Sequence, residues 1–353
     1  MRVEQLQTPA LILDKKIFEQ NIRAMQTLLQ DKTLQLRPHY KSHKCAAIAR
    51  LQIQNGAKGM TCAKLSEAED LADAGIEDIL IANQITDPKK IRRAADLAGV
   101  CHLTVCVDNE ENINALSRAA ENAGTVIRCL IEFEIGMERC GVTTPEQVLQ
   151  LAKHISQQSH LHFSGIQAYA GHASHMTDPA QRQQVTADNS QRIKALLQLL
   201  QDAGYPAQIL SGGSTGTYQL KAEEGLYTEL QAGSYLFMDA TYGTLGLPFR
   251  QSLFLLTTVV SKRDGLTVVD AGVKTCGVDQ GMPAVEGCTT EQIVASEEHF
   301  QLHGLSRDVH VGDTLRLIPG HCCSTVNLHD RIYLVEDGKV VDRIAITGRG
   351  FGK

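Results

Sequence analysis

Residues 102–134 read HLTVCVDNEENINALSRAAENAGTVIRCLIEFE, and their pattern sets the architecture of the chain. The two ends, 102–108 and 126–134, are short apolar runs typical of buried strands. Between them, 110–122 has apolar residues at three- and four-residue spacing, which predicts an amphipathic helix. A strand, a helix and a second strand joined by short connections predict a βαβ unit, in which the two strands are parallel.

The same alternation continues in both directions from this unit. Apolar runs predict strands at 34–41, 59–63, 78–83, 102–108, 126–134, 163–171, 208–212 and 228–235. Helical spacing appears at 66–74, 88–98, 110–122, 145–156 and 180–203. Eight βα units predict an α/β fold, a TIM-like (β/α)8 barrel. An open doubly wound sheet is the alternative, but no glycine-rich dinucleotide fingerprint follows the first strand.

The pattern changes after Gly243. Short strands are predicted at 253–261, 266–270, 292–295, 314–318 and 331–335, joined by glycine and charged turns. A chain of 353 residues also exceeds the usual size of one domain, about 250 to 300 residues. We therefore predict a barrel domain over 1–245 and an all-β domain over 246–353. The strand-like segment 10–14 fits either domain.

Composition and charge narrow the class of protein. The net charge is −6, and 34 basic and 40 acidic residues are mixed throughout, which argues against nucleic acid and anionic membranes as partners. No run approaches the roughly 20 apolar residues of a membrane span, and the N-terminus has no long apolar signal segment. We expect a cytoplasmic protein whose ten cysteines are reduced.

Reactive side chains gather at the predicted carboxyl ends of the strands, where barrel enzymes place their active sites. The first strand ends in RPHYKSHK, residues 37–44. Lys41 in this segment can form an imine with a carbonyl, and pyridoxal phosphate held in this way is the usual electron sink for chemistry at an amino-acid α-carbon. A basic strand end in solvent is the structural alternative, but the convergence of strand ends favours Lys41 as a catalytic residue.

The segment SGGSTGT, residues 211–217, follows the seventh strand and is suited to a phosphate, because glycines and hydroxyls present donors to an anion. The sequence GSY at 233–235, after the eighth strand, could supply a second wall. A surface turn is the alternative. The candidate phosphate ligands are Ser211, Gly213, Ser214, Thr215, Gly233, Ser234 and Tyr235.

Two further segments contain groups for acid–base or metal chemistry. AYAGHASH at 168–175 offers the phenol of Tyr169 and the imidazoles of His172 and His175 for proton transfer. In PGHCC at 319–323, an extended backbone would point His321 and Cys323 to the same side, where they could share zinc or manganese. A buried cysteine pair beside a hydrogen-bonded histidine is the alternative.

Together these segments resemble the fold-type III pyridoxal-phosphate enzymes, and within them the D-threonine aldolase and D-serine dehydratase group. The signatures occur in the family's order: RPHYKSHK, EFEIGMERCG, GIQAYAGH, SGGSTGTY, ELQAGSYLFMDATYG, VVDAGVKTCGVDQGMP and PGHCCSTVNLHD. The resemblance implies that Lys41 holds pyridoxal phosphate and that Arg139 and Tyr169 lie beside its ring. It also implies a divalent metal, zinc or manganese, at His321 and Cys323, with His175 as catalytic base.

The resemblance implies cleavage of a D-3-hydroxy amino acid to glycine and an aldehyde. Dehydration to ammonia and a 2-oxo acid is the alternative, because Cys323 stands where the aldolases usually have an aspartate. A non-catalytic cofactor-binding protein is a further alternative, which the β domain and the metal motif disfavour. An amino-acid racemase is another, and it would need a base on each face of the α-carbon and no metal. The resemblance also implies a homodimer.

Overall fold

The computed structural model describes residues 1–352. The chain divides into two compact units. The barrel unit consists of Leu28–Lys41 and Ile48–Gly233, and the β unit consists of Met1–Thr27, Ser42–Ala47 and Ser234–Gly350. No helix in residues 1–352 is both long enough and apolar enough to cross a bilayer.

The barrel unit is built on an eight-stranded parallel sheet with the strand order β2-β9-β8-β7-β6-β5-β4-β3. A parallel bridge between His39 and Thr61 joins the two ends of this order, so the sheet closes on itself and the predicted barrel is confirmed. The strands are β2 (Gln35–Leu36), β3 (Met60–Cys62), β4 (Asp78–Ile81), β5 (His102–Val107), β6 (Ile127–Glu132), β7 (Leu161–Ala168), β8 (Ile209–Gly212) and β9 (Glu229–Leu230).

Several strands are shorter than the apolar runs suggest. β2 ends at Leu36, and a 3₁₀ turn at Tyr40–Ser42 bends the chain where the sequence predicts a strand. β7 ends at Ala168, because a second 3₁₀ turn starts at Gly171 (η3, Gly171–His175). The residues that follow β2 and β7 still alternate between apolar and polar side chains, which explains why the sequence predicts longer strands. In the structure these residues lie in irregular backbone around the barrel mouth. By mouth we mean the end formed by the carboxyl ends of the strands, and by floor the opposite end.

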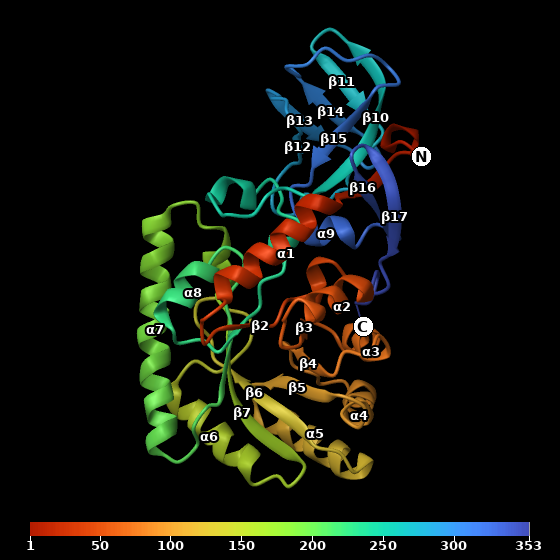
Figure 1. Ribbon diagram of the computed structural model, residues 1–353. Coiled ribbons are helices and arrows are strands. Elements are labelled where there is room, and N and C mark those ends of the chain that lie inside the picture. The colour runs from red at the N-terminus through yellow and green to blue at the C-terminus, as the bar shows by residue number, and fades with distance from the viewer. Residues whose placement is uncertain (353) are drawn as a thin grey trace. The chain divides into compact units, whose positions relative to one another are not determined.

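Helices follow the strands around the outside of the barrel (Figure 1). They begin at side-chain caps such as Asp87, Asn109, Thr144 and Asp178, each of which accepts hydrogen bonds from backbone amides of the first turn. Two helices that the sequence analysis missed, α2 and α8, are short. The helices are α2 (Ala46–Gln54), α3 (Leu65–Asp73), α4 (Pro88–Leu97), α5 (Glu110–Ala123), α6 (Pro145–Ser156), α7 (Pro179–Asp202) and α8 (Tyr218–Glu224).

A thin apolar layer crosses the middle of the barrel. Leu80, Cys106 and Leu130 are at most 1% exposed and pack against one another. Side chains two positions apart on a strand lie on the same face. A residue two positions after a member of this layer therefore lies toward the mouth, and a residue two positions before it lies toward the floor. Glu132 lies on the mouth side of Leu130, and Arg128 lies on its floor side.

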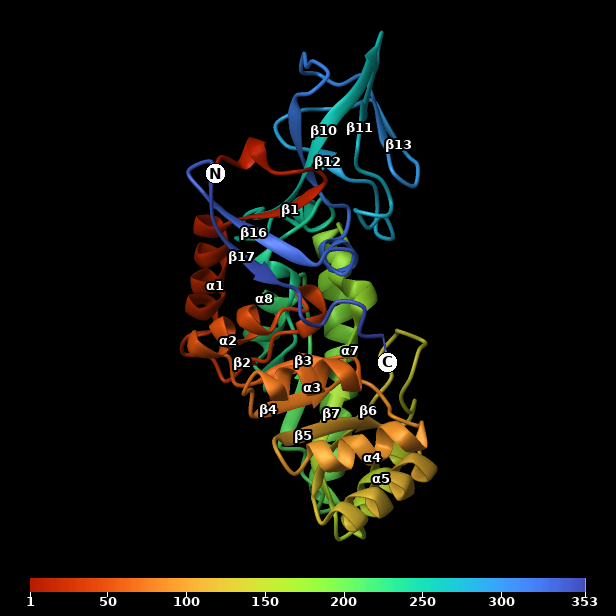
Figure 2. The ribbon, with the colours of Figure 1, turned by 90° about the vertical axis from the view of Figure 1, so that its right-hand side faces the viewer.

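The β unit contains a nine-stranded sheet with the main order β13-β14-β11-β10-β1-β16-β17. β15 pairs with β10 and β12, and β10 and β11 run side by side as a long hairpin (Figure 2). This confirms the predicted all-β architecture. The strands are β1 (Ala10–Asp14), β10 (Leu253–Arg263), β11 (Leu266–Val269), β12 (Ala284–Val285), β13 (Gln292–Ala295), β14 (Phe300–His303), β15 (Thr314–Ile318), β16 (Arg331–Glu336) and β17 (Lys339–Ala345).

The N-terminal strand β1 belongs to this sheet, which resolves the two options for segment 10–14. It pairs antiparallel with β10 and parallel with β16. The helix that follows, α1 (Lys15–Leu29), is absent from the predicted elements. Its buried side chains Phe18, Ile22, Met25 and Leu29 recur at helical spacing, so the signal was present in the sequence.

Candidate active site

Lys41 lies at the barrel mouth and lines a cavity of about 130 Å³. The cavity brings Lys41 together with Arg139 and Tyr169, although these residues follow three different strands. The Nζ atom of Lys41 lies 5.7 Å from the centroid of the Tyr169 ring, within the range of a cation–π contact. The remaining lining residues are His39, Ala63, Ala82, Asn83, Gln167 and Gln231.

Glu132 is a residue of this site that the sequence analysis did not single out. Its side chain is 8% exposed and its Oε1 atom lies 3.7 Å from Nη2 of Arg139. Gln84 donates a hydrogen bond of 2.6 Å to the other carboxylate oxygen. Burial raises the pKa of Glu132, although Gln84 and Arg139 act in the opposite direction. The carboxylate therefore orients a guanidinium that is itself half exposed at the cavity.

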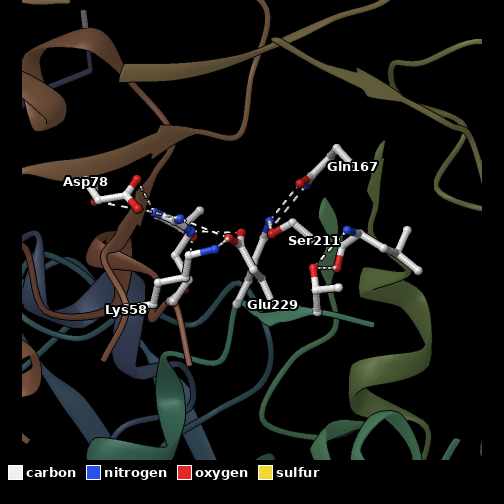
Figure 3. A network of polar contacts seen from close by, with 10 residues as sticks. Lys58, Asp78, Gln167, Ser211 and Glu229 are labelled. Atoms are coloured by element: carbon white, nitrogen blue, oxygen red, sulfur yellow. Dashed lines mark hydrogen bonds and ion pairs between the residues drawn. The ribbon is translucent and has the colours of Figure 1, made fainter. Parts of the chain in front are cut away.

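A network of amides closes the cavity toward the barrel interior. Gln231 donates hydrogen bonds to Oε1 of Gln167, at 2.7 Å, and to Oγ of Ser211, at 3.0 Å. Figure 3 shows the side chains of Gln167 and Ser211 in this network. Ser211 is fully buried. Its hydroxyl therefore lies among interior amides, and the assignment of Ser211 to the phosphate stays a prediction.

The segment after β8 forms a tight turn held by its own hydroxyls. The backbone amide of Ser214 donates to Oγ1 of Thr217 at 3.0 Å, and Oγ of Ser174 donates to Oγ of Ser214 at 2.7 Å. A Cβ atom on Gly216 would lie 2.0 Å from the carbonyl oxygen of Ser174, so only glycine allows this approach. Gly213, with φ +71°, needs the left-handed conformation. A small, well-ordered turn of amides and hydroxyls suits a phosphate.

The candidate phosphate residues are divided between the two units. Gly213, Ser214, Thr215 and Gly233 belong to the barrel unit. Ser234 and Tyr235 begin the last segment of the β unit. Both side chains are buried, and the Tyr235 ring packs against Phe249 with a centroid distance of 5.6 Å.

The two candidate imidazoles lie in the turn η3. His172 packs against Gly136, where a Cβ atom would be 2.7 Å from Cε1 of the ring. Within residues 1–352, the buried Nδ1 atom of His172 has no hydrogen-bond partner. His175 follows Ser174, whose hydroxyl binds Ser214, so the turn that contains His175 is tied to the candidate phosphate turn.

His321 and Cys323 lie in the β unit at the start of a short helix, α9 (Cys322–Val326). The expectation of an extended segment is therefore wrong beyond His321, because the helix turns the chain at Cys322. The two side chains nevertheless hydrogen-bond to each other. Nδ1 of His321 is 2.7 Å from Oδ2 of Asp279, and Ser324 donates to the other Asp279 oxygen at 2.5 Å.

The electrostatics of this pair suit a cation. Burial alone lowers the pKa of His321, but Cys323 and Asp279 outweigh burial and raise the pKa to about 9. Within residues 1–352, no group of three His, Cys, Asp or Glu side chains is placed to hold a metal. An imidazole and a thiol in contact are donors that fit a borderline-soft divalent ion, with the remaining positions open to water or substrate.

The fold is of the alanine racemase type, and comparisons with known proteins agree. The family model for the alanine racemase N-terminal domain matches residues 13–241, and the model for a putative serine dehydratase domain matches residues 252–335. A D-threonine aldolase from Arthrobacter sp. is 39% identical, over 99% of this chain and 94% of the relative. A 3-hydroxy-D-aspartate aldolase from Paracoccus denitrificans is 40% identical, over 100% and 94%.

Solved structures give the same result. The crystal structure of D-threonine aldolase from Filomicrobium marinum matches with a TM-score of 0.96 and 36% identity, over 100% of this chain and 98% of that one. A D-threo-3-hydroxyaspartate dehydratase, solved as a cysteine-to-alanine variant in the metal-free form, matches with a TM-score of 0.87 and 25% identity, over 98% of both chains. The chain belongs to the fold-type III pyridoxal-phosphate enzymes, in the group of the D-threonine aldolases and D-serine dehydratases. It is a pyridoxal-phosphate-dependent lyase, and the predicted resemblance is confirmed.

Proposed function

We propose that this protein cleaves D-3-hydroxy amino acids between the α- and β-carbons, giving glycine and an aldehyde, and that it uses pyridoxal phosphate and a divalent metal. The observation that supports this most is the cavity in which Lys41, Arg139 and Tyr169 meet. It occurs in a chain that is 39% identical to a D-threonine aldolase and 40% identical to a 3-hydroxy-D-aspartate aldolase. When bound, the cofactor supplies an electron sink for the bond that breaks.

Residues of the chain are proposed to bind the cofactor, its phosphate and the substrate. Lys41 would hold the cofactor through its amine. Arg139, oriented by Glu132, presents its guanidinium to an oxygen of cofactor or substrate. The turn that contains Gly213, Ser214 and Thr215 binds the phosphate, with Gly233, Ser234 and Tyr235 as candidates for the second wall.

His175 is the proposed base that accepts the proton of the substrate's β-hydroxyl. Its turn is fixed to the phosphate turn through the hydrogen bond between Ser174 and Ser214. This hydrogen bond therefore fixes the position of His175 relative to the proposed phosphate turn. A general base must be positioned in this way to accept the substrate proton. Tyr169 lies beside the Lys41 amine and is proposed to pack against the cofactor ring.

His321 and Cys323 are proposed to hold the metal, either zinc or manganese. The contact between Asp279 and Nδ1 of His321 leaves the Nε2 atom as the coordinating nitrogen, the usual carboxylate–histidine–metal arrangement. A divalent ion there would act as a Lewis acid on the substrate hydroxyl.

Dehydration to ammonia and a 2-oxo acid is the second candidate. It is favoured by Cys323, because the family resemblance implies an aspartate at this position in the aldolases and a cysteine in the D-serine dehydratases. The aldolase has more support, because the two aldolase relatives share 39% and 40% of their residues with this chain.

Product analysis separates the two reactions. The purified protein is loaded with pyridoxal phosphate and with zinc or manganese, and is incubated with D-threonine, D-serine and the 3-hydroxyaspartates, with L-enantiomers as controls. Glycine and an aldehyde support the aldolase, whereas ammonia and a 2-oxo acid establish the dehydratase. Interconversion of enantiomers that resists chelators would indicate a racemase, and no turnover at all would indicate a binding protein.

Three further predictions belong with this proposal: the domain boundary, the oligomeric state and the cellular location. The domain boundary at 245/246 is supported by the two family matches, which end at residue 241 and begin at residue 252. A homodimer and a cytoplasmic location are proposed on the family resemblance and on composition.

A further inference from the structure

A second cavity lies at the floor of the barrel, at the opposite ends of the strands from Lys41. Its volume is about 700 Å³, within the range of about 300 to 1,000 Å³ typical of small-molecule sites. It is formed by residues at the starts of β5, β6, β7 and β8. The lining residues are Lys58, Ala98, Cys101, His102, Leu103, Val126, Arg128, His162, Ser164, Gln208 and Ile209.

The apolar layer of the barrel separates this cavity from the lysine site. Leu80, Cys106 and Leu130 form the layer, with Ala82 and Ile209 packed against it. Ala82 lines the mouth cavity and Ile209 lines the floor cavity. A ligand at the floor would therefore not touch Lys41, and the two cavities are distinct sites.

Charged groups beside the floor cavity are paired with one another. Arg37 is 2% exposed and binds two carboxylates, Glu229 at 2.8 Å and Asp78 at 3.0 Å. Lys58, which lines the cavity, binds Oε1 of the same Glu229 at 2.9 Å. Figure 3 shows Lys58, Asp78 and Glu229 around the central guanidinium. The two carboxylates, of Glu229 and Asp78, are therefore already paired with two cations.

Arg128 adds a third cation to this region. Within residues 1–352 it makes no salt bridge, and its one hydrogen-bonding contact is Nη2 to Nδ1 of His102, at 3.4 Å. His162 lies opposite Arg128 in the sheet register, and its Nδ1 atom is 3.0 Å from Oγ of Ser164. The cavity wall therefore has an unneutralised guanidinium between two imidazoles, with a lysine nearby.

We propose that the floor cavity binds a small organic or inorganic oxyanion, a carboxylate or phosphate group held by Arg128. The guanidinium fork matches either anion with two parallel hydrogen bonds. Lys58, His102 and His162 surround the anion, and the apolar side chains of Ala98, Leu103, Val126 and Ile209 contact the rest of the ligand. This site does not depend on the reaction proposed at Lys41.

Calorimetric titration of the holoenzyme with two probes, inorganic phosphate and malonate, tests this site. Bound cofactor occupies its own phosphate turn, so that turn does not compete for the probe. We expect saturable binding of at least one probe by the wild-type protein. Arg128→Gln should weaken this binding by about tenfold or more, because it removes the charge-assisted hydrogen bonds. Arg128→Lys, which keeps the charge but loses the fork, should have an intermediate affinity.

Arg118→Gln is the matched control, because Arg118 is an exposed arginine on α5 that does not line the cavity. It should bind the probes as the wild type does. Absence of saturable binding by the wild-type holoenzyme would overturn the proposal. Equal affinities of wild type and Arg128→Gln, with cofactor absorbance and melting temperature unchanged, would also overturn it. Whichever probe binds more tightly identifies the anion, carboxylate or phosphate.

Discussion

At the residue scale, the candidate metal pair depends on a neighbour that is distant in sequence. His321 contacts Asp279, 42 positions away, and this contact fixes which ring nitrogen is free. Cys323 is the other proposed donor, and it is the residue on which the aldolase and dehydratase proposals differ. Its thiol therefore offers a direct test of metal choice, independent of turnover.

Cys323→Asp should change the metal preference. A thiolate favours zinc over manganese, so we expect the ratio of zinc affinity to manganese affinity to fall by about tenfold or more. Competition with a chromophoric chelator measures both affinities on the purified protein. Cys288→Ser, a half-buried thiol of the same unit, is the control and should leave the ratio unchanged. An unchanged ratio in Cys323→Asp would show that this thiol is not a ligand.

Glu229 provides a prediction for stability and pH. Burial alone raises the pKa of Glu229, but Arg37 and Lys58 outweigh burial and hold the pKa below its ordinary value. A carboxylate of this kind stabilises the fold above its unfolded pKa, and the stabilisation is lost as the pH falls through the folded pKa. Glu229→Gln should lower the unfolding free energy by about 3 kcal/mol at pH 7, because the buried Arg37 loses one of its two carboxylate partners.

The difference between wild type and Glu229→Gln should shrink as the pH falls below the ordinary glutamate pKa of about 4.3, because the unfolded chain takes up a proton there and the folded carboxylate only at lower pH. Urea unfolding at several pH values measures it. Glu223→Gln, an exposed position on α8, is the control and should cost little at any pH. A difference that stays constant from pH 7 to pH 3 would contradict the assigned pKa direction.

At the element scale, the site is made where regular strands stop. The turn η3 and the segment after β8 are pressed together, with Gly216 against the Ser174 carbonyl. These two loops connect the proposed base His175 with the proposed phosphate ligands. The sequence indicated each loop separately through its glycines, histidines and hydroxyls, but not the contact between them.

Gly216→Ala should disturb both loops, because its Cβ atom would be 2.0 Å from a backbone oxygen that cannot rotate away. Overpacking of this kind costs about 1–3 kcal/mol, and we expect a loss of cofactor affinity of about tenfold or more. Absorbance titration of the apoprotein with pyridoxal phosphate measures the affinity. Gly243→Ala, where nothing lies within 4 Å of the added Cβ, should bind the cofactor normally. Normal affinity in Gly216→Ala would mean that the turn does not hold the phosphate.

At the scale of the whole molecule, the N-terminus and the C-terminal half build one sheet. β1 at Ala10–Asp14 pairs with β10 and β16, more than 200 residues away in sequence. The barrel unit is inserted between these segments of the β unit. The two family models match this chain on either side of residues 242–251, and the solved D-threonine aldolase structure covers both parts.

The assembly predicted from the family resemblance is a homodimer. Light scattering of the holoenzyme should give twice the mass of one chain at the concentrations used for assays. Dilution that separates the subunits should reduce activity in parallel with the loss of dimer, if the dimer is needed for turnover. A single-chain mass together with full activity would show that one subunit is sufficient.

The sequence by itself determined the barrel, the all-β domain, the lysine, the glycine-rich turn and the His-x-Cys motif, because each is encoded by local periodicity or by residues close together in the chain. Tertiary structure decided which sheet β1 joins, that Glu132 orients Arg139, that Asp279 holds His321, and that Arg37 is buried between two carboxylates. It also decided that a cationic cavity lies under the apolar layer of the barrel. These pairings join residues that are distant in sequence, and their energies depend on burial and on distances of a few ångströms. A local sequence pattern predicts neither the burial nor the distances.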